Sequence, residues 1–193
     1  MIFSRTSTPL KDPNQEKAAQ LLLTPTALAD LSVADARVVT GFMLLRRVRM
    51  GSVFIKEGES THNDFMMLVL EGDVAVESEL ASLNDTMVMS IIGPGNLIGE
   101  MGVLDGAPRS ASCTASSDLA VAVLSREALL DLIKRRPAVA ARFMLAISKR
   151  LADRLREANR KVRTLGGLSR ALQEELDVAH HGSGLATVST PLV

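Results

Sequence analysis

Glu100 and Arg109 stand nine positions apart in a short segment rich in glycine, "GEMGVLDGAPRS", which covers residues 99–110. Glutamate offers two acceptor oxygens, and arginine presents a planar cationic fork of N–H donors. Together they could grip a small polar anion, pair with each other, or face solvent in an ordinary connection. Glycine and proline usually mark a connection, so the elements around the segment must decide among these interpretations.

The composition describes a globular chain with an aliphatic core. Of the 193 residues, 47% are hydrophobic and 23% are charged, and the aromatic residues are five Phe. Basic and acidic residues balance at 22 each, so we expect no broad electrostatic attraction to DNA or to a membrane surface. The scarcity of aromatic side chains also argues against the stacking sites that hold single-stranded nucleic acid.

Neither the cysteine content nor the apolar runs indicate secretion or membrane insertion. Cys113 is the single cysteine, and its place in "ASCTA" favours a buried, inert thiol rather than a disulfide or a nucleophile. No apolar run approaches the ~18 residues of a membrane span, and the N-terminus lacks a signal-peptide core. We expect a soluble, cytoplasmic protein. No metal or cofactor is expected, because His62, His180 and His181 come with no further ligands.

The periodicity of the apolar residues divides the chain. Short alternating runs separated by glycine-rich turns are typical of an antiparallel β-sandwich or barrel, and helical patterns flank them. Ser32 and Ser125 are expected to cap the helices that follow them. We predict four regions: a loosely ordered arm (1–24), a β-domain with flanking helices (25–137), a long helix (138–165), and, after a break at Gly166–Gly167, a short helix with a flexible tail (166–193).

The long helix carries a heptad stripe that favours a homodimer. Ser148 is its one polar member, and charged residues occupy the other faces, as in a coiled coil. For the first half of the stripe, packing on the chain's own β-domain is an equal alternative. The apolar members are Met144, Leu151, Leu155, Ala158, Val162 and Leu165.

Residues 26 to about 163 resemble the cyclic nucleotide-binding domain of the catabolite activator and protein kinase A regulatory families. "GSVFIKEGE" (51–59) is similar to an early strand pair with its glycine turn, and "LVLEGDVAV" (68–76) to the next hairpin. "IIGPGNLIGEMGVLDGAPRSAS" (91–112) is similar to the phosphate-binding cassette. The resemblance implies an α+β fold, an antiparallel jelly roll (double-stranded β-helix) with N-terminal helices and a long C-terminal helix.

The resemblance also implies roles for the cassette residues. Arg109 would hold the phosphate of a cyclic nucleotide, Glu100 a ribose hydroxyl, and Ser110 would add a hydroxyl or amide donor. Gly99 and Gly102 would let the main chain approach the ligand beside the N-terminus of a short helix. The implied ligand-binding residues are Gly99, Glu100, Met101, Gly102, Arg109, Ser110, Ala111 and Arg154.

The residues that would meet the base depart from the family. Counting from Arg109 without a gap places Arg154 and Leu155 at the base-contact positions, where the family typically has small hydroxyl residues. Arg154 could stack on the base or donate to a purine acceptor, or simply lie on a solvated helix face. The ligand could be cAMP, cGMP or a cyclic dinucleotide. In addition, Asn63 stands where the family usually has glycine, and asparagine tolerates left-handed backbone.

We expect a bacterial-type cyclic nucleotide sensor that signals to a protein partner through its C-terminal helix. The residues after Leu165 leave no room for a helix-turn-helix with a basic face, so we do not expect DNA as a partner. No catalytic set is recognisable, so no enzyme activity is expected. The alternatives are a ligand-free dimeric scaffold of the same fold and a cyclic di-GMP receptor.

Overall fold

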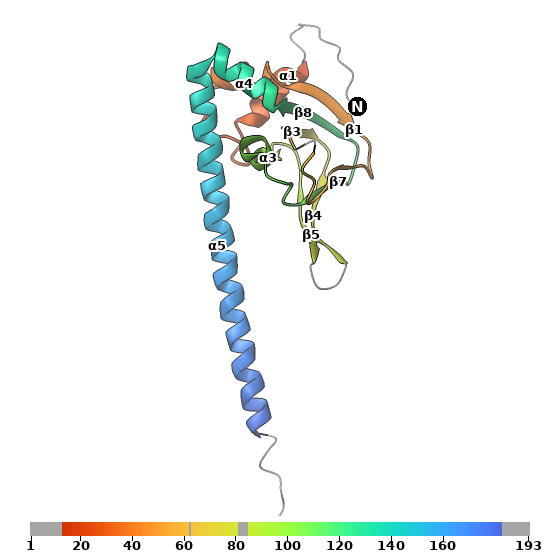
Figure 1. The fold of residues 1–193 in the computed structure, drawn as a ribbon, viewed down its shortest axis with the longest axis vertical. Helices are drawn as coiled ribbons and strands as arrows, with labels where there is room; N and C mark the ends of the chain where they lie inside the picture. Colours follow the sequence, from red (N-terminus) through yellow and green to blue (C-terminus); the bar gives the residue numbers. More distant parts are fainter. Residues whose placement is uncertain (1–12, 62, 81–84, 183–193) are drawn as a thin grey trace, which may run out of the picture. The chain divides into compact units, whose positions relative to one another are not determined.

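The computed structural model describes residues 13–61, 63–80 and 85–182. The chain divides into two compact units, Met1–Arg150 and Leu151–Val193. The first unit contains all the strands and four of the described helices, together with the start of the fifth (Figure 1). The second unit is the remainder of that fifth helix, α5, which spans Pro137–Gly182.

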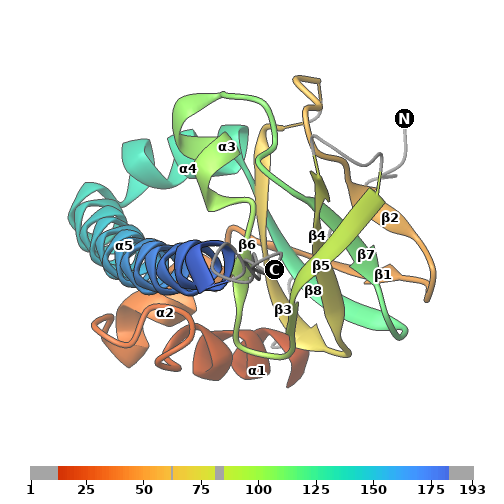
Figure 2. The same ribbon diagram turned by 90° about the horizontal axis from the view of Figure 1, so that it is seen from below.

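The strands form two four-stranded antiparallel sheets, and their order confirms the predicted fold class. One sheet has the order β1 (Leu44–Val48), β8 (Leu119–Ser125), β3 (Phe65–Glu71), β6 (Leu97–Ile98). The other has the order β2 (Val53–Ile55), β7 (Ser112–Ala115), β4 (Val74–Leu80), β5 (Asp85–Ile92). Because neighbours in each sheet are mostly distant in sequence, the chain crosses repeatedly between the sheets, as in a jelly roll (Figure 2).

The core lies between the two sheets and is aliphatic. Met67, Val69 and Val121 of one sheet pack in the same cluster as Val74 and Cys113 of the other. Cys113 is buried, which confirms the expectation of a buried thiol. Burial raises the pKa of this thiol to about 12, so almost no thiolate is present at neutral pH.

A helical layer precedes the strands, and it begins earlier than predicted. Helix α1 (Pro13–Leu22) buries Ala18, Ala19 and Leu22, so the prediction of a loosely ordered arm is wrong for residues 13–22. The segment "AAQLL" supplies a narrow apolar face that its polar neighbours obscure in the sequence. Residues 1–12 lie outside the described part of the chain.

Serine caps begin two further helices of this unit, as predicted. The Ser32 hydroxyl accepts a hydrogen bond from the Asp35 N–H (3.1 Å) at the start of α2 (Val33–Thr40). Likewise, the Ser125 hydroxyl accepts from the Ala128 N–H (3.1 Å) at the start of α4 (Arg126–Arg135). Each cap satisfies an N–H group that the first helical turn leaves without a partner.

The start of α5 is fastened to the N-terminal helical layer. The Arg142 guanidinium donates to both carboxylate oxygens of Asp35, at 2.8 and 2.6 Å, and Lys149 pairs with Asp30 at 2.7 Å. The hydrogen bonds from Arg142 hold the pKa of the buried Asp35 carboxyl below its ordinary value. Phe143 and Ile147, on the same stretch of α5, are fully buried.

Helix α5 continues without interruption through Gly166 and Gly167, so the predicted break there is wrong. An interior glycine costs only about 1 kcal/mol relative to alanine, and strong helix formers stand on both sides of the pair. Residues 183–193 of the predicted tail lie outside the described part of the chain. Within that part, no helix is long and apolar enough to cross a membrane.

Candidate ligand-binding site

The central element of the site is α3 (Glu100–Asp105), a six-residue helix between two glycines. Gly99 precedes it with φ of 76°, and Gly106 follows it with φ of 73°, a left-handed conformation that glycine adopts without strain. The Gly106 N–H donates to the Gly102 carbonyl at 3.0 Å, which ends the helix. The glycine punctuation of the sequence therefore encodes a short helix between β6 and the loop that carries Arg109.

Arg109 is a buried cation whose guanidinium and main chain are both fixed. Its side chain donates to the Gly99 carbonyl at 3.1 Å and to the Phe65 carbonyl at 2.9 Å. The guanidinium carbon also lies 4.5 Å from the centre of the Phe65 ring, within the range of a cation–π interaction. The Arg109 N–H donates to the Glu59 carbonyl at 3.0 Å, and the Arg109 carbonyl accepts from the Gly58 N–H at 2.8 Å.

The Arg109 side chain approaches Gly99 and Gly102 closely, whereas the approach of a ligand to the main chain there stays a prediction. A Cβ at Gly99 would lie 2.6 Å from the Arg109 Nη1 atom. A Cβ at Gly102 would lie 2.9 Å from the same atom and 2.9 Å from the Asn63 carbonyl oxygen. These two glycines thus allow the guanidinium to lie against α3.

The structure brings Glu100 and Arg109 into one buried cluster. Their exposed fractions are 2% and 5%. Burial lowers the pKa of the Arg109 guanidinium, and the Asp64, Glu59 and Glu100 carboxylates oppose that shift. Burying charged groups costs free energy, so the buried Glu100 of α3 and the buried Arg109 beside it form a candidate binding site.

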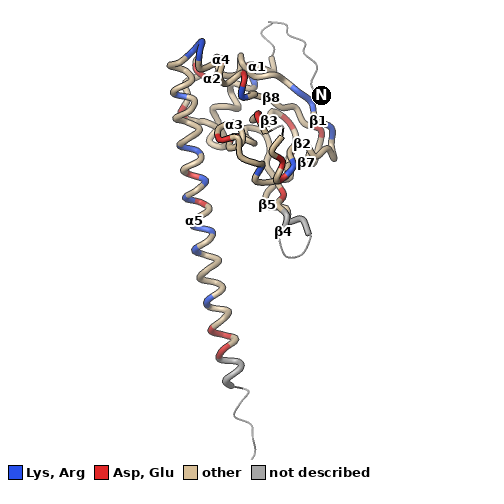
Figure 3. The backbone as a smooth tube through the Cα atoms, viewed as in Figure 1, with Lys and Arg blue, Asp and Glu red and all other residues tan. Residues whose placement is uncertain are grey.

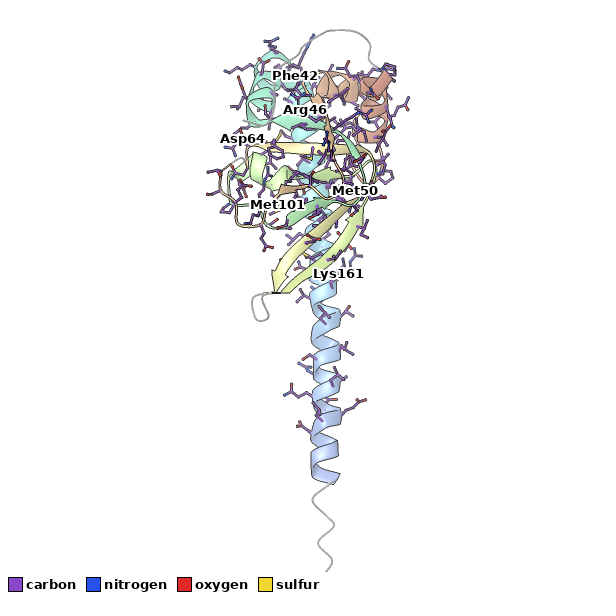
Figure 4. All side chains as sticks on the ribbon, turned by 90° about the vertical axis from the view of Figure 1, so that its right-hand side faces the viewer. Phe42, Arg46, Met50, Asp64, Met101 and Lys161 are labelled. Atoms are coloured by element: carbon purple, nitrogen blue, oxygen red, sulfur yellow. The ribbon has the colours of Figure 1, made fainter. Side chains whose placement is uncertain are left out.

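The other predicted site residues are placed differently. Met101 on α3 is about half exposed, at 46% (Figure 4). Ser110 is exposed and Ala111 is half-buried, so both flank the cluster at its surface. Arg154 belongs to the second unit, where it lies on an exposed part of α5. A role of Arg154 at the base stays a prediction.

Two side chains that hold the cassette have no assigned role in the sequence-based prediction. The Asn63 amide donates to the carbonyls of Gly106 and Ala107, at 2.8 and 2.9 Å, so it fastens the loop after α3. The Arg126 guanidinium donates to the Gly102 carbonyl at 3.2 Å. The sequence indicated only that Asn63 stands where the family usually has glycine, which concerns its backbone conformation and not the hydrogen bonds of its side chain.

Comparisons with known proteins agree with this geometry. The family described as cyclic nucleotide-binding domain matches residues 45–136. The cyclic AMP receptor protein of Thermus thermophilus is 43% identical over 65 residues, which cover 34% of this chain and 30% of the relative. The structure of the catabolite activator protein of Thermus thermophilus matches with a TM-score of 0.61 and 30% identity, over 71% of this chain and 61% of that one.

A further solved structure, a cyclic nucleotide-binding domain from Methylobacillus flagellatus KT, matches with a TM-score of 0.66 and 29% identity. The match covers 75% of this chain and 79% of that one. The chain contains a cyclic nucleotide-binding domain at residues 45–136, and its fold is similar to that of the catabolite activator protein. It spans less than half the length of the curated relatives that it matches first.

Proposed function

We propose that the chain is a sensor, which binds a cyclic nucleotide at residues 99–111 and passes the signal to a protein partner through α5. One observation carries the proposal. The buried Arg109 guanidinium is held by the carbonyls of Gly99 and Phe65 inside the cassette of a cyclic nucleotide-binding domain. The domain is a regulatory one, so we propose binding without catalysis.

The fixed guanidinium suits one negative phosphate. A planar fork binds phosphate oxygens in a defined orientation, and an arginine held in advance loses little conformational freedom when the ligand arrives. Glu100 supplies acceptor oxygens for a ribose hydroxyl, and the exposed Ser110 supplies a further donor. Repulsion between Glu100 and the phosphate requires the two groups to contact different parts of the ligand.

Calorimetric titration with cAMP, cGMP and cyclic di-GMP tests this proposal. We propose cAMP or cGMP as the ligand, and the T. thermophilus relative bears the name cyclic AMP receptor protein. Arg109→Ala should weaken binding by about 10- to 150-fold, the equivalent of a charge-assisted hydrogen bond of about 1.5–3 kcal/mol. Arg135→Ala is the matched control, because Arg135 pairs with Asp131 on the exposed face of α4.

Each outcome of the titration has one meaning. Absence of heat with all three nucleotides would overturn the sensor proposal and favour a ligand-free scaffold. Heat with cyclic di-GMP alone would show that the ligand is a cyclic dinucleotide and not cAMP or cGMP. Equal binding by wild type and Arg109→Ala would show that the nucleotide binds at another site. Arg154→Ala tests the base contact, since its effect should differ between cAMP and cGMP if Arg154 donates to guanine.

We further propose that the chain forms a homodimer through residues 138–165 of α5. Leu155, Val162 and Leu165 are each more than 60% exposed, and an apolar stripe of this spacing is the seam of a coiled coil. Because α5 continues through the glycine pair, the same heptad register extends to Leu172 and Leu176.

The charges on α5 are compatible with a parallel pair. Basic residues dominate the helix before Gly166 and acidic residues dominate it afterwards (Figure 3). At the positions that flank a parallel seam, Arg154 and Lys161 would face Asn159 and Gly166 of the second copy, so no like charges oppose each other. Leu165→Glu should yield a monomer in light-scattering chromatography, whereas Ala171→Glu, off the stripe, should remain a dimer; a dimeric Leu165→Glu variant would contradict the seam.

A further inference from the structure

Two arginines from different elements hold α3, and only Arg109 lies in the cassette. Arg126 is the first residue of α4, and its guanidinium donates to the Gly102 carbonyl at 3.2 Å. A Cβ at Gly106 would lie 3.2 Å from the Arg126 Nη2 atom, so the guanidinium lies beside the glycine that ends α3. A cation is favoured there, because the carbonyls at a helix C-terminus carry partial negative charge.

The two arginines are also joined through consecutive carbonyls of the main chain. The Arg126 N–H donates to the Asp64 carbonyl at 2.6 Å, and the Arg109 guanidinium donates to the Phe65 carbonyl at 2.9 Å. Asn63, the residue before, donates to the carbonyls of Gly106 and Ala107. Residues 63–65 therefore contact the proposed phosphate-binding arginine, the loop after α3 and the first residue of α4.

The Arg126 guanidinium is only partly hydrogen-bonded. Its Nε atom is buried and has no hydrogen-bond partner within the part of the chain that the structure describes. A buried donor without a partner costs free energy, and that cost depends on how tightly α3 and α4 enclose the atom. A shift of α3 relative to α4 changes the surroundings of this atom, and the two helices are thereby linked energetically.

We infer that Arg126 is the positioning residue that transmits movement of α3 to α4, and from there to the start of α5. The inference rests on the proposed function, because it takes nucleotide binding at Arg109 as the event that moves α3. A ligand changes a conformational equilibrium only through contacts that differ between the two states. Arg126 does not touch the ligand, so those contacts are made at Arg109 and α3. The Arg126 hydrogen bond to the Gly102 carbonyl then couples the position of α3 to that of α4.

Amide hydrogen exchange with and without saturating cAMP or cGMP tests the inference on the full chain. In the wild type, nucleotide should slow exchange in both α3 and α4. In Arg126→Gln the protection of α3 should persist, while that of α4 is lost. Arg135→Gln, on the same helix but paired with Asp131, should behave like the wild type.

Arg126→Lys provides a second variant, which keeps the charge but lacks the planar fork. It should restore part of the α4 response, and it serves as the test variant if Arg126→Gln does not fold. A full wild-type response of α4 in Arg126→Gln, or in Arg126→Lys if that is the variant that folds, would overturn the inference. So would a wild type that binds nucleotide without any response in α4. Absence of nucleotide binding to the wild type, by contrast, would overturn the proposed function itself.

Discussion

Replacing Gly102 by alanine sets helix propensity against packing. In an exposed helix, glycine to alanine stabilises by about 1 kcal/mol. In α3 the new Cβ would lie 2.9 Å from the Arg109 Nη1 atom and 2.9 Å from the Asn63 carbonyl oxygen. One of these neighbours is main chain and the other is a buried guanidinium, so the methyl group must displace atoms that the structure holds firmly.

The packing effect should outweigh the propensity gain. Inserting a methyl group into a close-packed site costs about 1–3 kcal/mol, so Gly102→Ala should lower the free energy of unfolding by up to about 2 kcal/mol after the gain of about 1 kcal/mol from propensity. A displaced Arg109 would also lose its alignment with the phosphate that we propose it binds. Loss of one charge-assisted hydrogen bond, about 1.5–3 kcal/mol, corresponds to about 10- to 150-fold weaker nucleotide binding.

Gly167→Ala is the matched control, because it makes the same change in a helix where no atom lies within 4 Å of the added Cβ. Thermal unfolding and calorimetric titration of both variants are the measurements. Gly102→Ala should unfold at a lower temperature and bind more weakly, while Gly167→Ala should keep the affinity of the wild type and lose no stability. A Gly102→Ala variant as stable and as tight as Gly167→Ala would refute the packing argument.

Three further predictions address the residues around this cluster and the fold that carries it. Phe65→Leu removes the cation–π interaction with Arg109, about 0.5–2 kcal/mol, so nucleotide affinity measured by titration should fall about 2- to 30-fold; an unchanged affinity would show that the ring is not needed. Asp35→Asn breaks the contact with Arg142, which lowers the pKa of the Asp35 carboxyl below 3.8. That contact therefore stabilises the folded state above about pH 4, and the stabilisation is lost as the pH falls through the lowered pKa. The variant should therefore melt below the wild type at pH 7 but approach it near pH 3, and a gap that widens in acid would contradict the assignment. Cys113, with a pKa raised to about 12, should react with a thiol reagent at pH 8 only after unfolding in urea, and rapid native labelling would contradict its burial.

The sequence was sufficient for the features that depend on local pattern. The alternation of apolar residues predicts the two sheets, and the serine caps predict where α2 and α4 begin. The spacing of Gly99, Glu100 and Arg109 predicts a segment in which a short turn brings both charges together. These features could be predicted because each depends on backbone conformation or side-chain period over a few residues.

The features that escaped prediction depend on distant contacts or on small energy differences. Arg126 meets α3 across 24 positions of sequence, and nothing next to it in the chain indicates that contact. The amide of Asn63 reaches Gly106 across 43 positions, in a similar way. The prediction of a helix break at Gly166–Gly167 was wrong for another reason. Two glycines weaken a helix locally, but they do not end it.

The continuity of α5 through Gly166 and Gly167 has a consequence for how the dimer would assemble. An isolated helix in water is marginally stable, and this pair removes about 2 kcal/mol of intrinsic propensity. Leu172 and Leu176 beyond the pair are exposed in the single chain, so a partner that covers them would add to the stability of this segment. If that partner is a second copy, helix formation and association are one equilibrium here, and far-ultraviolet ellipticity should decline on dilution along the same curve as the dimer population.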